Sequence, residues 1–325
     1  MPSGSPLKNA ARVAFHKVGG LNMARWVNRN GLRILMYHRF SQREALARQC
    51  AHIRARYSPV SMSQAANWLA GRRQLPKNAL AVTVDDGYRD FYQVAYPVLR
   101  EYGIPATVYL VSDFVDRSCW LWVDQVRYGF LQAQAPSFRL DLPGHSPRSF
   151  QLGTPEMRKA AACAVVEAAK EISNTERLRL LKTLPGQLEV RLPEEAPAEY
   201  EALRWEEVRE MAAAGIEFGA HTRTHPVLSR LAGERELVIE IAGSKRQIEQ
   251  QVGRAAEHFC YPNGAWDDVG SRAVEAVRAG GFRTAVTAES GMNHVAADPF
   301  RLLRIGVEPG FEMDYFERCA AGFRV

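Results

Sequence analysis

The sequence has no apolar run long enough to cross a bilayer, since no stretch approaches the ~20 apolar residues that a membrane-spanning helix needs. Cysteine is scarce: the five cysteines form no CxxC pair. This odd, unpatterned set argues against a disulfide framework and fits a reducing compartment. Internal repeats and low-complexity tracts are also absent, which excludes a repeat architecture. These absences together favour an ordinary globular protein.

The length and composition of the chain agree with that expectation. A chain of 325 residues has the length of one large α/β barrel or of two ordinary domains. Apolar residues make up 46% and charged residues 24%, which is typical of a globular protein with a substantial core. The net charge of +6 and the pI of about 9.1 suit an anionic surface or substrate. The charge is too diffuse to indicate a nucleic-acid partner.

The N-terminal segment carries no acidic residue before Glu44. Over residues 6–30, lysines and arginines are interleaved with apolar side chains, but there is neither an uninterrupted apolar h-region nor a clear cleavage site. We therefore expect no secretory signal and a cytoplasmic location. Two interpretations of residues 1–30 stay open. One is a basic amphipathic helix lying on an anionic inner membrane face, and the other is a helix packed on the domain with its basic side in water.

Strand-like and helix-like patterns alternate about seven times along the rest of the chain. The expected strands cover residues 32–38, 80–84, 106–111, 216–220, 258–261, 284–287 and 302–307. The expected helices cover residues 44–57, 61–69, 90–102, 205–214, 234–252 and 269–279. Residues 117–200 interrupt this rhythm with a tryptophan-rich piece, a loop over 136–149 and two helical patterns. Because the alternation resumes afterwards, we interpret them as an insertion rather than a separate domain.

Polar residues follow four of the expected strands, and in a parallel barrel those strand ends form the active face. The clearest case is Asp85 and Asp86 after an apolar strand. Two adjacent carboxylates at the end of a buried strand are costly unless a cationic group lies beside them, and a metal ion is the simplest such group. An ordinary Asp-Asp-Gly turn is the alternative.

A second polar cluster follows the strand that ends before His221. His221 and His225 have i, i+4 spacing, so a helical turn there would direct both imidazoles to one side. Two histidines and one carboxylate form a ligand set for Zn²⁺ or a similar ion, with positions left open for water. The alternative is a pair of surface histidines beside a turn. The Asp-Asp strand end makes the metal site the stronger interpretation.

These residues resemble the motifs of the NodB-like polysaccharide deacetylases, carbohydrate esterase family 4. Residues 83–87 (TVDDG) resemble its TFDDG motif, residues 221–225 (HTRTH) match its H-[ST]-x-x-H motif, and residues 259–264 are similar to a divergent R-x-P-Y-G motif. The resemblance covers about residues 31–310. It implies a distorted (β/α)7 barrel over residues 31–325, with 117–200 as a helical insertion, preceded by the basic segment 1–30.

The resemblance also implies a role for each matching residue. Asp86, His221 and His225 match the metal ligands, which would hold Zn²⁺ or else Co²⁺, Ni²⁺ or Mn²⁺. Asp85 matches the general base. In the third motif, the backbone after Tyr261 and Pro262 would place the Asn263 N–H at the oxyanion.

Several features depart from the common pattern of the family, including Asn263 at the tyrosine position of the third motif. Residues 34–38, which end in His38, are similar to a late motif moved to the N-terminus, as in permuted members that act on poly-N-acetylglucosamine. The resemblance therefore implies His38 as general acid, and a structural histidine bonded to backbone is the alternative. Cys260 replaces the arginine that usually tethers the base, and Arg304 is a candidate to supply the missing cation. No DxxDW-like fourth motif is visible.

The expected activity is removal of an N-acetyl group from a sugar of a polysaccharide or lipid-linked glycan, as in exopolysaccharide biosynthesis. Two other functions stay open: an O-deacetylase or deformylase of a lipid-linked sugar, and a carbohydrate-binding protein that has lost catalysis. Several aromatic residues are candidates to stack on sugar faces, with core packing as the alternative. They are Trp120, Trp122, Trp266 and Tyr261.

Overall fold

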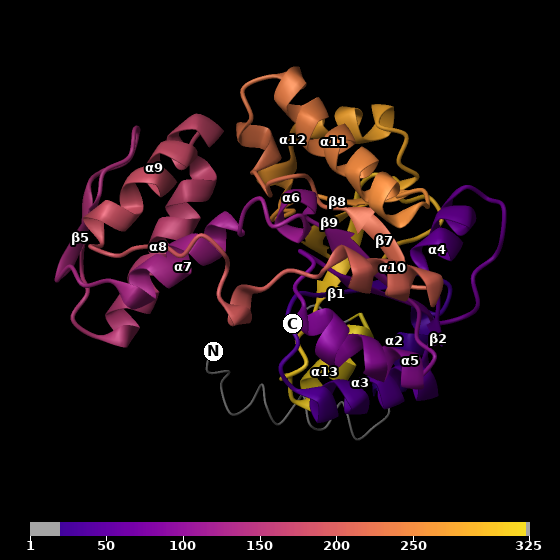
Figure 1. Cartoon of the computed structure of the whole chain (residues 1–325). Helices are drawn as coiled ribbons and strands as arrows, with labels where there is room; N and C mark the ends of the chain where they lie inside the picture. The colour runs from indigo at the N-terminus through magenta and orange to yellow at the C-terminus, as the bar shows by residue number, and fades with distance from the viewer. Residues whose placement is uncertain (1–19, 323–325) are drawn as a thin grey trace.

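The computed structural model describes residues 20–322, and its centre is a closed ring of parallel strands (Figure 1). Hydrogen bonds run round the ring in the order β1-β10-β9-β8-β7-β4-β3, and β3 pairs with β1 to close it. This confirms the predicted (β/α)7 barrel. The ring strands are β1 (Arg33–Tyr37), β3 (Ala79–Val84), β4 (Ala106–Leu110), β7 (Glu217–Ala220), β8 (His258–Cys260), β9 (Thr284–Ser290) and β10 (Leu302–Gly306), while the short β2 (Ser58–Pro59) pairs with the start of β3.

Helices cover the outside of this barrel. They are α2 (Gly20–Val27), α3 (Arg43–Arg56), α4 (Met62–Leu69), α5 (Tyr96–Glu101), α6 (Ser112–Val115), α10 (Trp205–Ala213), α11 (Glu234–Val252), α12 (Trp266–Ala279) and α13 (Met313–Ala320). The predicted capping box at the start of α4 is confirmed, since the Ser61 side chain accepts from the Gln64 N–H and the Gln64 side chain accepts from the Ser61 N–H. The helix expected over 90–102 is divided into one π-helical turn, Phe91–Ala95, and α5.

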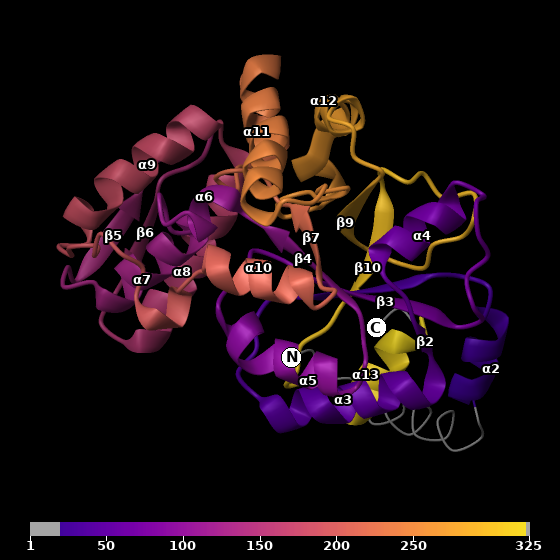
Figure 2. The same cartoon turned by 45° about the vertical axis from the view of Figure 1, so that its right-hand side comes forward.

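The insertion forms a lobe beside the barrel, as the two views in Figures 1 and 2 show. It consists of α7 (Trp122–Gln132), α8 (Pro155–Glu171), α9 (Asn174–Gln187) and the antiparallel hairpin β5 (Ser137–Leu140) and β6 (Arg148–Gln151). These elements bury a hydrophobic cluster of their own, which includes Phe130, Val165 and Leu184. The prediction of a loop over 136–149 was wrong, because Phe138 and Leu140 are buried between exposed neighbours, as in a half-buried strand.

Successive side chains of the barrel strands point to opposite faces of the sheet, and each face packs in a different hydrophobic cluster. Ile34 and Ala81 belong to a buried cluster inside the barrel, which Met62 of α4 joins. Their neighbours Leu35 and Val82 belong to the large cluster between the barrel and its helices. Strands buried on both faces need continuous apolar runs, which accounts for the pattern of the sequence.

The carboxyl ends of all ring strands meet at one end of the barrel, because the strands are parallel. There, His38 follows β1, Asp85 follows β3, His221 follows β7 and Tyr261 follows β8. Residues that lie up to 223 places apart in the chain, as His38 and Tyr261 do, are thus brought to one rim. The fold itself therefore gathers the strand-end residues that the sequence singles out.

The prediction for the N-terminal segment can be compared with the structure only from Gly20 onward, because residues 6–19 lie outside the described ones. In α2, Leu21 and Arg25 are buried, whereas Met23 and Trp26 are exposed. The expectation of a wholly water-exposed basic side is therefore wrong for Arg25. Among residues 20–322, no helix combines the length and the apolar character that a membrane span requires.

Candidate metal centre

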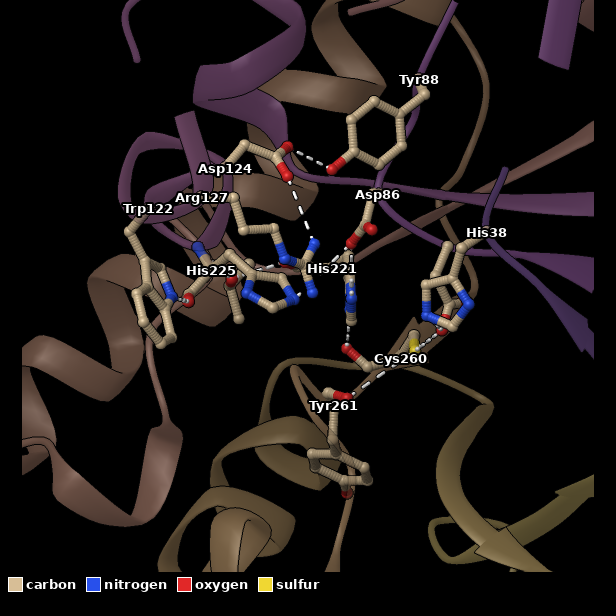
Figure 3. A network of polar contacts seen from close by, with 12 residues as sticks. His38, Asp86, Tyr88, Trp122, Asp124, Arg127, His221, His225, Cys260 and Tyr261 are labelled. Atoms are coloured by element: carbon tan, nitrogen blue, oxygen red, sulfur yellow. Dashed lines mark hydrogen bonds and ion pairs between the residues drawn. The ribbon is translucent and has the colours of Figure 1, made fainter. Parts of the chain in front are cut away.

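Asp86, His221 and His225 lie together at the carboxyl end of the barrel (Figure 3). One carboxylate oxygen, Asp86 Oδ1, is 3.5 Å from His221 Nε2 and 3.6 Å from His225 Nε2. All three side chains are buried. The structure thus brings together the three residues that the sequence proposes as metal ligands.

The loop after β7 positions the two histidines in a way that the sequence did not predict. The sequence left open whether the chain turns helically from His221 to His225, and the structure shows that this segment is irregular. Thr222 and His225 have left-handed backbone, with φ of 67° and 58°. The Thr222 hydroxyl accepts a hydrogen bond from the His225 N–H at 3.0 Å, which fixes this turn. Asp86 is left-handed as well, with φ of 76°. Strained backbone of this kind clusters at functional sites.

The hydrogen bonds around these residues fit a bound cation. His221 Nδ1 lies 2.7 Å from the Cys260 carbonyl oxygen, which only accepts, so Nδ1 carries a proton and donates it. Nε2 then faces Asp86 Oδ1 at 3.5 Å, a buried oxygen without a hydrogen-bond partner in the described part of the chain. A deprotonated Nε2 and a carboxylate oxygen repel unless a positive charge lies between them, and a bound cation would supply that charge. Two imidazole nitrogens and one carboxylate oxygen are a ligand set for Zn²⁺ and similar ions.

The electrostatics of the protein groups point the same way. Burial lowers the pKa of His225 to about 3, so this imidazole is neutral and keeps a lone pair for a ligand bond. Burial tends to raise the pKa of Asp86, but its contacts with His221 and His225 outweigh burial and hold that pKa well below its usual range, so the carboxylate is charged at neutral pH. Burial lowers the pKa of His221, but Cys260 and the Asp86 carboxylate outweigh it and raise that pKa well above its usual range. Without a metal, His221 therefore carries a positive charge beside Asp86, and a cation that binds there would replace the Nε2 proton.

Asp85 lies next to this ligand set and is held by Arg304 of β10. Both guanidinium Nη atoms donate to Asp85, one to each carboxylate oxygen, at 2.7 Å. Burial alone would raise the pKa of Asp85, and the Arg304 charge outweighs it and lowers that pKa. The structure also places Cys260 Sγ 3.4 Å from Asp85 Oδ2 and 3.2 Å from Arg304 Nη2. Arg304 thus places a cation beside Asp85, next to Cys260, which stands where the third motif usually has its arginine.

A second set of candidate ligands, Asp85, His221 and Cys260, also lies close enough to share an ion. Both oxygens of Asp85 are already bonded to Arg304, which leaves this carboxylate ill-suited to a metal. Burial raises the pKa of the Cys260 thiol, so it stays protonated rather than becoming a thiolate ligand. The set with Asp86 is therefore the better metal site.

The other predicted site residues surround this centre. His38 Nε2 is 3.7 Å from Asp85 Oδ2, and its side chain is 47% exposed, at the rim. The Tyr261 N–H donates to the Val286 carbonyl at 3.2 Å, and Pro262 has no N–H. The Asn263 N–H finds no acceptor among residues 20–322, and φ of Asn263 is 59°. Of the three predicted oxyanion residues, Asn263 alone offers a free backbone donor within the described chain.

Comparison with known proteins agrees with this geometry. A family model described as polysaccharide deacetylase matches residues 72–284, more than half of the chain. The chain belongs to the polysaccharide deacetylase family. The family that the sequence motifs predict is thus confirmed.

Two curated relatives match part of this chain. YxkH of Bacillus subtilis (strain 168) is 27% identical over 140 residues, which cover 39% of this chain and 50% of that protein. The poly-beta-1,6-N-acetyl-D-glucosamine N-deacetylase of Escherichia coli (strain K12) is 38% identical over 73 residues, 22% of this chain and 11% of that protein. The chain therefore spans half the length of YxkH and a smaller part of the Escherichia coli protein.

Solved structures share the fold of this chain. IcaB from Ammonifex degensii superposes with a TM-score of 0.59 at 21% sequence identity, and the match covers 90% of this chain and 96% of that chain. At this identity the likeness concerns the fold, and it agrees with the barrel described above.

The insertion contributes a polar network beside the candidate metal centre, and the sequence analysis did not predict it. Asp124 of α7 is buried, accepts a hydrogen bond from the Tyr88 hydroxyl and lies 3.4 Å from Arg127 Nη1 (Figure 3). Burial raises the pKa of Asp124 to about 6. Tyr88 follows Asp86 by two residues, so this network is joined to the loop that carries a candidate ligand.

The aromatic candidates for sugar stacking are mostly core residues. Trp120, Trp122 and Tyr261 are buried, and the Tyr261 hydroxyl donates to the Phe300 carbonyl at 3.0 Å. Stacking on a sugar is therefore wrong for these three. Trp266, at the start of α12, is 44% exposed.

Proposed function

We propose that this protein is a metal-dependent N-deacetylase that acts on an N-acetylated sugar of a polysaccharide or lipid-linked glycan. The observation that carries the proposal is the position of Asp85. It is a buried carboxylate held on both oxygens by Arg304, directly beside the Asp86–His221–His225 set. An oriented base next to a divalent-ion site is the arrangement that amide hydrolysis by water requires.

Asp86, His221 and His225 would hold the metal, with Zn²⁺ as the preferred ion. A divalent cation bound there would act as a Lewis acid on the acetyl carbonyl and lower the pKa of water. Asp85 takes the proton of the attacking water. Its lowered pKa keeps it ionised at neutral pH, and Arg304 prevents it from rotating away. Arg304 thus acts on the reaction by positioning Asp85.

His38 and Asn263 are the two remaining groups of the proposed active site. The Asn263 N–H would donate to the oxygen on which negative charge develops as water attacks. His38 lies at the rim within 3.7 Å of Asp85, and in its protonated form it would deliver a proton to the departing sugar amine. An amine leaves poorly without that proton, so an exposed histidine beside the base is a suitable acid.

The proposed substrate class rests on family membership and on the substrate printed in the name of one relative. The Escherichia coli relative is named for poly-beta-1,6-N-acetyl-D-glucosamine, and the match to it covers 22% of this chain. We extend from that name only the common feature, an N-acetylated sugar amine.

An acetate-release assay tests this proposal. Zn²⁺-loaded wild type is expected to release acetate from N-acetylhexosamine oligomers or from a lipid-linked N-acetyl sugar, because its groups are arranged for amide hydrolysis. The panel includes matched O-acetyl and N-formyl sugars. Release from the O-acetyl or N-formyl sugars alone would establish an esterase or a deformylase instead. Saturable sugar binding without any release would establish a binding protein.

A further inference from the structure

His225 is held in its strained conformation by groups on both sides of its peptide. Its N–H donates to the Thr222 hydroxyl within the same loop. Its carbonyl oxygen accepts from the Trp122 indole Nε1–H at 3.0 Å and lies 3.5 Å from Arg177 Nη1 (Figure 3 shows the Trp122 bond). A non-glycine residue in left-handed backbone persists only where its surroundings fix it.

Both groups that reach this carbonyl come from the insertion. Trp122 begins α7 and Arg177 lies in α9. Each side chain is only 3% exposed, and the guanidinium carbon of Arg177 lies 4.9 Å from the centre of a Trp122 ring. Trp122 also packs in the hydrophobic cluster of the insertion. The insertion and the loop 221–225 therefore share one buried contact, centred on the His225 carbonyl.

We propose that Trp122 is a positioning residue for the metal ligand His225, and that the insertion sets the direction in which this imidazole points. This inference rests on the proposed metal centre. The indole N–H fixes the peptide of His225, and the Arg177 guanidinium fixes the indole by stacking on it. Groups that orient a ligand commonly change metal affinity about 10–100-fold when they are removed.

The test compares Trp122→Phe with Trp205→Phe in the full chain. Phenylalanine keeps an aromatic ring in each place and removes one indole N–H. Trp205 is a matched control, because it is buried too and its Nε1–H donates to Asp116 Oδ1 at 3.1 Å, outside the candidate site. Zn²⁺ affinity is measured by competition with a chromophoric chelator, and the melting temperature of the metal-free proteins is recorded in parallel. We expect about 10-fold weaker Zn²⁺ binding in Trp122→Phe and wild-type affinity in Trp205→Phe.

Equal Zn²⁺ affinity in wild type and Trp122→Phe would overturn the inference, even if the melting temperature of the variant fell, because the indole would then only support packing. A wild-type protein that binds no Zn²⁺ would overturn the metal centre itself. Arg177→Met keeps the test decisive if Trp122→Phe does not fold. It removes the guanidinium from the Trp122 ring, and a smaller loss of Zn²⁺ affinity is expected. Unchanged affinity in Arg177→Met would then count against the inference.

Discussion

Replacing Asp85 by asparagine is expected to lower turnover by about 10²–10⁴-fold and to leave the metal content unchanged. Asparagine has nearly the same shape but cannot take a proton from water. The Asp86–His221–His225 set does not include Asp85, so the ion should remain bound. Acetate release per enzyme molecule and metal per chain, measured on the same sample, check both halves of this prediction.

Two outcomes would contradict the role of Asp85. If Asp85→Asn retains turnover within a factor of about ten of wild type, the carboxylate is not the base. If the variant instead loses its metal, Asp85 is itself a metal ligand, and its hydrogen bonds to Arg304 do not keep it from binding the ion.

The ion pair between Arg304 and Asp85 should also contribute to the free energy of unfolding. Replacing Arg304 by methionine is expected to lower the free energy of unfolding at neutral pH by about 3–5 kcal/mol, because it leaves the buried Asp85 carboxylate without its partner. Urea denaturation followed by circular dichroism measures this difference. Arg33→Met is the matched control. Arg33 is fully buried in the neighbouring strand β1 and donates to the Ala320 carbonyl at 2.9 Å, so its loss leaves a carbonyl rather than a carboxylate unpaired.

The pH dependence gives this prediction a second test. Arg304 lowers the pKa of Asp85, so in wild type this pair stabilises the fold above the unfolded pKa of Asp85, and the contribution is lost as the pH falls through the folded pKa. Without Arg304, burial raises that pKa, and protonation removes the unpaired charge. The stability difference should therefore narrow between about pH 7 and about pH 4. A difference that is absent at neutral pH, or that does not change with pH, would show that Arg304 does not compensate the Asp85 charge.

The barrel could be predicted from the sequence because the determinants of its strands and helices are local. Continuous apolar runs such as 80–84 mark doubly buried strands, and Ser61 with Gln64 marks a helix start. The hairpin of the insertion was not predicted because the proline, glycine and serine residues around 143–149 are typical of a loop. The buried alternation of Phe138 and Leu140 was the signal that could have found it.

The ligand residues could be proposed from motifs, but their geometry could not. His221 and His225 are four residues apart, and left-handed backbone at Thr222 and His225 brings their side chains together. The residue types of this loop do not predict that conformation, because threonine and histidine rarely adopt it. The approach of Arg304 to Asp85 depends on closure of the ring between β10, β1 and β3, which is a property of the whole fold. The bond from Trp122 to His225 likewise crosses between the insertion and the barrel.

Metal stoichiometry in wild type and Asp86→Asn tests the account most directly. Asp86 supplies the one carboxylate oxygen of the proposed centre, and Asp85→Asn, one residue away, is the control for loss of a charge. After Zn²⁺ loading and dialysis, elemental analysis should find about one ion per chain in wild type and in Asp85→Asn, and none retained in Asp86→Asn. Full occupancy in Asp86→Asn, or no bound ion in wild type, would contradict the central claim that these three side chains share a metal ion.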